Sequence, residues 1–178
     1  MVTFTNTNTN TNTNKIKVPI RYLPFRLSEK DKLKQAQMLI KSRKLYKKGK
    51  YFTRKQVKSF HSKPSKHISN ARKIYKIENI VPSKKLSDAT GCSIKTLKKI
   101  VNKGEGAYYS SGSRPNQTAQ SWGLARLASS ITSGKAAAVD YDLLEKGCDH
   151  KKRAFILANK AREIYNHGHS KTHKVVIV

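Results

Sequence analysis

Residues 84–102, KKLSDATGCSIKTLKKIVN, indicate their own fold more clearly than any other part of the chain. Their apolar positions recur at helical spacing on both sides of Gly91, which predicts two short helices that pack together at a glycine-containing turn. Ser93 stands where a side-chain oxygen caps the second helix. The apolar positions are Leu86, Ala89, Ile94, Leu97, Ile100 and Val101.

The two predicted helices resemble the helix-turn-helix of lac-repressor-type regulators. In that resemblance Gly91 is the turn residue and Ala89 is the small residue where the helices cross. The resemblance implies that DNA lies near Lys95, Thr96, Lys98 and Lys99. An ordinary helical hairpin uses the same packing without DNA, and the sequence leaves both alternatives open.

Capping signals predict further helices on both sides of this segment. Ser28, followed by Glu29 and Asp31, predicts a helix start, and Gly49 predicts its end. Thr53 with Gln56 has the spacing of a second capping box, and Ser65 precedes a third helix. Toward the C-terminus we expect helices over about residues 118–134, 139–147 and 150–168.

These elements predict a mainly α fold, with a small helical domain at about residues 66–168, an extended basic N-terminal arm and a short extended C-terminal tail. We divide the chain into an extended, low-complexity arm (1–27), a basic helical region (28–77), a small helical domain (78–168) with a Gly/Ser/Tyr loop at 104–117, and a tail (169–178). The Thr-Asn repeats within 5–14 are expected to be disordered. Residues 175–178 are suited either to a strand on a partner's sheet or to folding back on their own domain.

Positive charge is the dominant property of the composition. The 178 residues carry a formal net charge of +28. Residues 1–77 hold 21 Lys and Arg against two acids, whereas residues 78–178 hold 17 against eight. Like charge at this density opposes compaction and attracts phosphates, acidic protein faces or anionic lipid. We therefore expect an acidic partner.

Several classes of protein and site are disfavoured. The two cysteines, Cys92 and Cys148, lie in different segments, so we expect a reducing compartment and no disulfide. We expect no secretory signal and no membrane span. Cys148 and the nearby histidines lack the paired thiols of a zinc site, and no pattern marks a nucleophile or an acid-base pair. We expect no enzyme, no metal, no cofactor and no small-molecule substrate.

Residues 42–60 have the composition of single-strand nucleic-acid binders. Tyr46, Tyr51, Phe52 and Phe60 alternate with basic residues, a pattern that supplies both stacking and phosphate contacts. A solvated basic face over a small aromatic cluster explains the same pattern, so the alternatives stay open. The basic residues that we expect to contact nucleic acid here are Lys47, Lys48, Lys50, Arg54 and Lys55.

Four phrases carry a wider resemblance. They are VPIRYLP (18–24), SRKLYKKGKYFTRKQVKSF (42–60), SKHISNARKIYKI (65–77) and GEGAYYSSGSRPNQTAQSWGLARLASSITSGKAAAVDYDLLEKGC (104–148). The chain resembles a family of small basic proteins of uncharacterised function from nucleocytoplasmic large DNA viruses, the giant viruses. The resemblance implies a virion component and brings no catalytic residues.

Two classes of function follow from the resemblance and the charge. The first is a non-enzymatic minor capsid (cement) protein on the interior face of the capsid, present in host cytoplasm or nucleus during assembly. Its partners are viral capsid proteins, contacted through Pro19, Arg21, Tyr22, Pro24, Phe25, Tyr108, Tyr109, Arg114 and Pro115. The alternative is a basic protein that binds double-stranded DNA for genome packaging or through the helix-turn-helix; an inner membrane surface is a further candidate partner. The sequence favours the first class narrowly.

Overall fold

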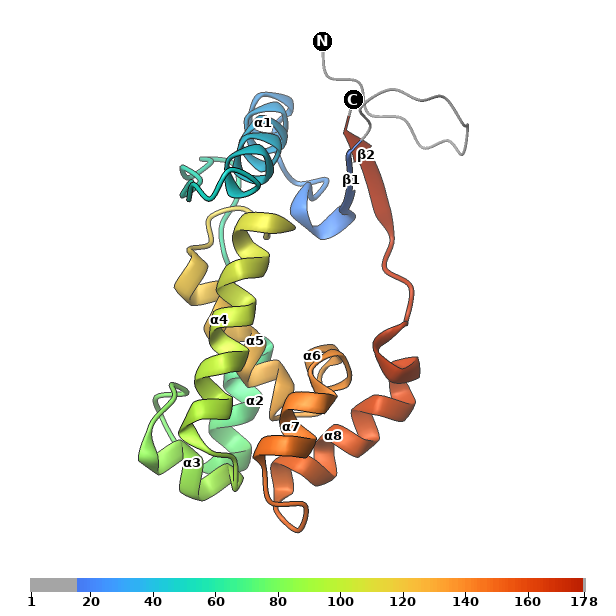
Figure 1. The fold of residues 1–178 in the computed structure, drawn as a ribbon. Coiled ribbons are helices and arrows are strands. Elements are labelled where there is room, and N and C mark those ends of the chain that lie inside the picture. The colour runs from blue at the N-terminus through green and yellow to red at the C-terminus, as the bar shows by residue number, and fades with distance from the viewer. Residues whose placement is uncertain (1–15, 178) are drawn as a thin grey trace. The chain divides into compact units, whose positions relative to one another are not determined.

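The computed structural model describes residues 16–177, so the predicted disorder of the Thr-Asn repeats lies outside the described residues. The described part of the chain contains eight α-helices and one two-stranded sheet, which confirms the mainly α fold (Figure 1). None of the helices within residues 16–177 is long and apolar enough to cross a bilayer.

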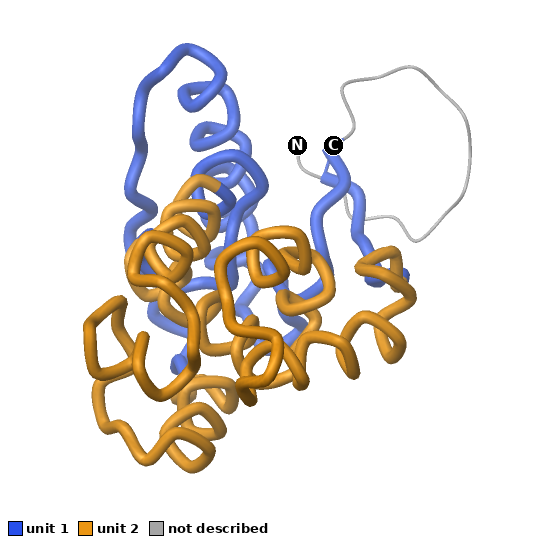
Figure 2. Tube along the Cα trace, turned by 60° about the horizontal axis from the view of Figure 1, so that its bottom comes forward, with its two compact units in different colours: residues 1–62, 107–119, 171–178 blue, residues 63–106, 120–170 orange. Residues whose placement is uncertain are grey.

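The chain divides into two compact units, each assembled from separate stretches of sequence (Figure 2). Unit 1 contains residues 1–62, 107–119 and 171–178, and unit 2 contains residues 63–106 and 120–170. The sequence predicts contiguous regions instead, because neither propensity nor capping shows that distant stretches join one unit.

Unit 1 is organised around α1 (Glu29–Tyr46). The Ser28 hydroxyl accepts a hydrogen bond from the Asp31 N–H at 3.3 Å, which confirms the predicted cap. The buried face of α1 includes Ala36, Met38 and Leu39. Met38 packs with Leu27 and Val57 in a small core that Phe52 and Phe60 flank.

The two ends of the described chain pair with each other in unit 1. Strand β1 (Ile16–Pro19) and strand β2 (Lys174–Ile177) form an antiparallel ladder in which Ile16 faces Ile177 and Pro19 faces Lys174 (Figure 1). A short 3-10 turn (Ile20–Tyr22) follows β1. Residues 174–177 therefore fold back within the chain, but onto the N-terminal strand and not onto the helical domain predicted at 78–168.

Residues 50–57 form no helix, so the prediction of a helix capped by Thr53 and Gln56 is wrong. The segment is held by long-range contacts. The Val57 N–H donates to Asn116 Oδ1 at 2.8 Å, and Asn116 Nδ2 donates to the carbonyl oxygens of Val57 (3.0 Å) and Phe60 (2.6 Å). Asn116 thus supplies hydrogen bonds that a local helix would otherwise provide.

Unit 2 is a helical bundle. Its elements are α2 (Lys66–Tyr75), α3 (Lys84–Thr90), α4 (Ile94–Ser110, as far as Gly106), α5 (Ala119–Ser130, from Gln120), α6 (Lys135–Val139), α7 (Tyr141–Gly147), α8 (Arg153–Ile164) and a 3-10 turn (Asn166–Gly168). The side chains at its centre are fully buried: Leu86, Leu97, Ile100, Leu127, Ile131 and Leu144. The Tyr75 hydroxyl donates to the Ile131 carbonyl at 2.6 Å, which joins α2 to the end of α5.

The α3–turn–α4 segment has the predicted local structure. Gly91 ends α3 in the left-handed region (φ +75°), and the Ser93 hydroxyl accepts from the Thr96 N–H at 3.2 Å. Both observations confirm the roles predicted for these two residues.

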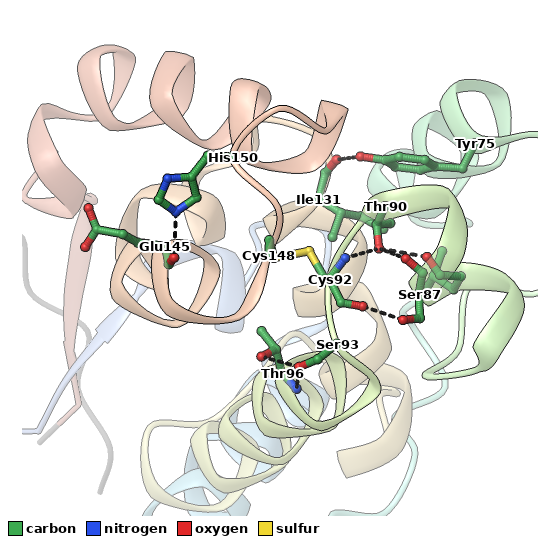
Figure 3. Close-up of a disulfide and its surroundings, with 11 residues drawn as sticks. Tyr75, Ser87, Thr90, Cys92, Ser93, Thr96, Ile131, Glu145, Cys148 and His150 are labelled. Carbon is green, nitrogen blue, oxygen red and sulfur yellow. Dashed lines mark hydrogen bonds between the residues drawn. A yellow bond between two sulfur atoms is a disulfide. The ribbon is translucent and has the colours of Figure 1, made fainter.

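Cys92 and Cys148 form a disulfide, so the prediction of no disulfide is wrong (Figure 3). The two residues face each other across an isolated antiparallel bridge. Backbone hydrogen bonds flank it, from the Ser93 N–H to the Gly147 carbonyl and from the Asp149 N–H to the Gly91 carbonyl, each 2.8 Å. This bridge brings together two cysteines that are 56 residues apart.

The first half of the predicted loop at 104–117 is helical, because α4 continues to Ser110, and residues 111–117 are irregular as predicted. The close contact between α4 and α5 explains why glycine occurs at positions 104 and 123. A Cβ added to Gly104 would lie 2.7 Å from the Gly123 Cα, and one added to Gly123 would lie 2.8 Å from the Val101 carbonyl oxygen. The glycines therefore permit close approach of α4 and α5 and do not break the helix.

Asp140 is the charged centre of unit 2. Its carboxylate is fully buried and accepts two 2.7 Å bonds from Arg126 and a third 2.7 Å contact from the Lys103 ammonium. The Ser130 hydroxyl donates to the same group at 3.3 Å. A buried carboxylate with this many donors is satisfied, so we assign it to stability.

Candidate functional site

The exposed face of α1 carries a line of lysines. They recur at helical spacing with Gln37 among them, and the last of them lies in the turn just after the helix end at Tyr46. All are exposed: Lys30, Lys34, Lys41, Lys44 and Lys48. Residues three and four apart on a helix lie on one face, and the stretch from Lys30 to Lys44 spans about 21 Å. We call these five residues the lysine stripe.

Acidic residues are few around the lysine stripe, and one of them, Asp31, interacts electrostatically with Lys34. The described stretches of unit 1 hold 18 Lys and Arg and two acids, Glu29 and Asp31. Lys34 Nζ donates to the Gln56 carbonyl at 3.1 Å, and Lys41 Nζ lies 4.8 Å from the centre of the Phe52 ring. Gln56 and Phe52 are neutral, and Asp31 acts at the Lys34 end of the stripe, so the stripe keeps a net positive charge for an external anion.

Three tyrosines gather where α1 ends. The Tyr46 and Tyr109 rings are nearly parallel, with centroids 6.2 Å apart. The Tyr51 ring meets both edge-on, at 6.1 Å from Tyr46 and 5.0 Å from Tyr109. These separations are typical of offset-stacked and T-shaped aromatic pairs. We call the three residues the tyrosine cluster.

A turn after α1 brings Tyr51 to this cluster. Gly49 adopts φ +69°, and the Lys50 N–H returns to the Leu45 carbonyl at 2.9 Å. The Gly49 N–H also donates to the Tyr46 carbonyl at 3.0 Å. The predicted helix stop at Gly49 is thus confirmed, and the turn presents Lys47, Lys48 and Lys50 as exposed residues beside the rings.

Arg54 supports the cluster from within, and is not an exposed phosphate ligand. Its side chain is buried, and its guanidinium donates to Ser42 Oγ (3.1 Å), to the Tyr108 carbonyl (2.9 Å) and to Ser113 Oγ (2.7 Å). Burial lowers the pKa of this guanidinium, and the neighbouring Tyr108 opposes that change. The prediction that Arg54 contacts nucleic acid is therefore wrong, because neutral internal acceptors occupy its donors.

Three of the residues predicted to contact capsid proteins are also internal. Tyr22 and Tyr108 are buried hydrophobic residues, and Pro115 is also buried. Their burial removes these three residues, but not the whole of 108–115, as a free surface for a partner. Pro19, Pro24 and Tyr109 are half-buried, whereas Arg21, Phe25 and Arg114 are exposed.

The residues predicted to contact DNA in the helix-turn-helix also divide into buried and exposed ones. Thr96 is buried, and its side chain fills the space that a Cβ on Gly147 would occupy. The prediction that Thr96 lies at a DNA groove is wrong, because it packs between α4 and the end of α7. Lys95, Lys98 and Lys99 are exposed on α4, as a groove contact requires.

The structure brings the predicted residues Lys47, Lys48, Lys50 and Lys55 into unit 1 as exposed side chains. Sequence reasoning missed the rest of the stripe, although the spacing of Lys30, Lys34, Lys41 and Lys44 already places them on one helix face. It also assigned Tyr109 to a different surface from Tyr46 and Tyr51. No local pattern shows that Tyr109, some sixty residues downstream, stacks on Tyr46.

One family model matches residues 19–146, and its description is a family of unknown function, DUF5824. The chain belongs to the DUF5824 family. The match spans α1, the tyrosine cluster and the Arg54 network, together with most of the bundle of unit 2. No curated protein and no solved structure matches this DUF5824 member.

Proposed function

We propose that this DUF5824 protein is a non-enzymatic nucleic-acid-binding protein, with unit 1 as the binding unit. The observation that supports the proposal is the lysine stripe, whose five exposed lysines run along α1 and into the turn after it and outnumber the two acids at the helix start, Glu29 and Asp31. Phosphate groups are the partners that such a line of ammonium groups favours, because each contact releases a condensed counterion. The virion setting rests on the resemblance to giant-virus proteins and belongs to the same proposal.

The salt dependence of binding tests this function. We expect the affinity for a labelled duplex to fall with salt at a log-log slope of about −0.9 for each phosphate contacted, or about −4.5 for a five-lysine stripe. Replacing Lys30, Lys41, Lys44 and Lys48 by Gln reduces the magnitude of the slope by about 3 to 4.

A matched control removes the same charge from unit 2. Gln replacements at Lys66, Lys73, Lys146 and Lys160, all exposed, leave the slope close to the wild-type value. Equal losses in the two quadruple variants contradict the assignment to unit 1, because net charge alone then governs binding.

The role of a minor capsid protein is the second candidate. Phe25 favours it, because this large apolar side chain is 81% exposed between Pro24 and Arg26. An exposed phenylalanine with an adjacent arginine suits a protein contact. Cross-linking in intact particles that joins residues 20–27 to a capsid protein supports this role; cross-links from that segment to the genome alone contradict it.

A further inference from the structure

We propose that the tyrosine cluster is a base-stacking site for single-stranded nucleic acid, with Tyr51 as the principal stacking residue. This inference rests on the proposed function and deepens it, because it specifies the form of nucleic acid and the residues that distinguish it. Phosphates contact Lys47, Lys48 and Lys50, and unpaired bases lie on the tyrosine rings.

Tyr51 has the exposure of a ligand-binding aromatic residue. Its side chain is 71% exposed, so it contributes little burial to the core formed by Leu27, Met38 and Val57. The half-buried rings of Tyr46 and Tyr109 hold it on two sides. An aromatic ring that is both exposed and braced loses little conformational entropy when a base stacks on it.

Several contacts hold Tyr109, the ring that packs closest to Tyr51 in the cluster. The Ser42 hydroxyl donates to the Tyr109 carbonyl at 3.1 Å, and Tyr109 meets the buried ring of Tyr108 edge-on at 5.0 Å. Arg54 fixes Tyr108 in turn, with its guanidinium carbon 3.7 Å from the ring centroid. The orientation of the Tyr109 ring is therefore set by residues from α1, from the 50–57 segment and from the end of α4.

The charge around the cluster selects a polyanion. No Asp or Glu occurs between Asp31 and Glu78, and none occurs in residues 107–119. Each base of a single strand has an exposed aromatic face next to a phosphate, so tyrosines interleaved with lysines match it chemically. In a duplex the bases stack on each other, so their aromatic faces are not exposed to the tyrosine rings.

An anionic membrane is the competing partner for a patch of tyrosine and lysine. Membrane attachment through such a patch is strengthened by apolar side chains that enter the acyl region, in addition to the attraction of lysines to anionic lipid. The exposed residues around the turn are Lys47, Lys48, Gly49, Lys50 and Tyr51, and none is aliphatic. The composition of the turn therefore favours bases over lipid.

The test compares three variants of the full chain. Tyr51→Leu removes the aromatic face, Tyr51→Phe retains it, and Phe25→Leu changes another exposed aromatic residue of the same unit. The probes are a labelled oligothymidine of about 15 nucleotides, within the site size of single-strand binders, and a duplex of equal length. Circular dichroism checks that each variant stays folded.

We expect Tyr51→Leu to weaken oligothymidine binding about 5- to 150-fold, the loss for one stacked base, without a change in the salt slope. Tyr51→Phe and Phe25→Leu stay within about twofold of wild type, and duplex affinity is the same in all three variants.

Three results overturn the inference, and they differ in what they say about the proposed function. Unchanged oligothymidine binding by Tyr51→Leu removes the stacking site alone, while the lysine-stripe variants still test nucleic-acid binding. If the wild-type chain binds neither the oligothymidine nor the duplex, both the nucleic-acid-binding function and the stacking site are excluded. Tyr51-dependent binding to phosphatidylserine vesicles, without Tyr51-dependent oligothymidine binding, assigns the patch to a membrane.

Discussion

The guanidinium carbon of Arg54 lies 3.7 Å from the centre of the Tyr108 ring, and the Tyr108 hydroxyl accepts a 3.0 Å hydrogen bond from the Arg54 backbone N–H. Each residue thus holds the other through both side chain and main chain. A buried cation is here stabilised by an aromatic face and neutral oxygens in place of a carboxylate. This pair joins the irregular segment after α1 to the end of α4, and so maintains the tyrosine cluster.

Replacing Arg54 by Met should destabilise unit 1 by about 3 kcal/mol, because Ser42, Ser113 and the Tyr108 carbonyl lose a charged donor while buried. Urea unfolding measures the effect. The adjacent exposed Lys55 is the matched control, and Lys55→Met should change stability by less than about 0.5 kcal/mol. Similar values for the two variants contradict the structural role of Arg54.

Thr96 and Gly147 should be energetically coupled. Gly147→Ala places a methyl group against the Thr96 side chain and should cost about 2 kcal/mol. Adding Thr96→Ala makes room for that methyl, so the double variant should recover part of the loss. A double-mutant cycle by thermal unfolding measures the coupling, and strict additivity would show that Thr96 does not pack at this position.

Reduction of the Cys92–Cys148 disulfide should lower the stability of unit 2. The bond closes a loop of more than fifty residues, and loops of this length predict a contribution of about 4 kcal/mol. Thermal melts with and without dithiothreitol measure it. The Cys92→Ala/Cys148→Ala variant should melt at the same temperature in both buffers, whereas the wild-type chain should melt lower in the reductant.

Asp31 should make stability depend on pH in the acid range. Hydrogen bonds from the Ser59 N–H and hydroxyl, each 2.7 Å, lower the pKa of its carboxyl from the ordinary value of 3.8. A carboxyl with a lowered folded-state pKa stabilises the fold above its ordinary pKa, and loses that contribution as pH falls through the folded value.

The Asp31→Asn variant measures this contribution. We expect it to unfold at lower urea concentration than the wild-type chain at neutral pH, and the difference should shrink once the pH falls below 3.8. A difference that is constant across this range would show that ionisation of Asp31 is not involved.

Sequence patterns predict the elements whose stability is local. The Ser28 and Ser93 caps, the Gly91 turn and the helix after Ser65 all follow from residues within one or two helical turns. Unit 2 also matches the predicted apolar spacing at Leu86, Leu97 and Ile100, because a single buried face determines that spacing.

Features that depend on distant residues are not predictable in this way. The helix predicted from the capping box at Thr53 and Gln56 does not form, because tertiary contacts hold this segment. The Val57 N–H bonds to Asn116, and the Arg54 N–H bonds to the Tyr108 hydroxyl. In the sequence Gly104 indicates a loop, because its partner in close helix packing, Gly123, can be identified only in the structure. The disulfide and the stack of Tyr109 on Tyr46 likewise require the assembled unit.

The most direct test of the account is ultraviolet cross-linking of the full chain to oligothymidine, followed by mass spectrometry of the joined peptides. We predict adducts in residues 44–55 and 107–114, the segments that carry Tyr46, Tyr51 and Tyr109, and their loss in the Tyr51→Leu variant. Adducts confined to residues 63–106 and 120–170, or adducts unchanged by that substitution, would contradict nucleic-acid binding by the tyrosine cluster of unit 1.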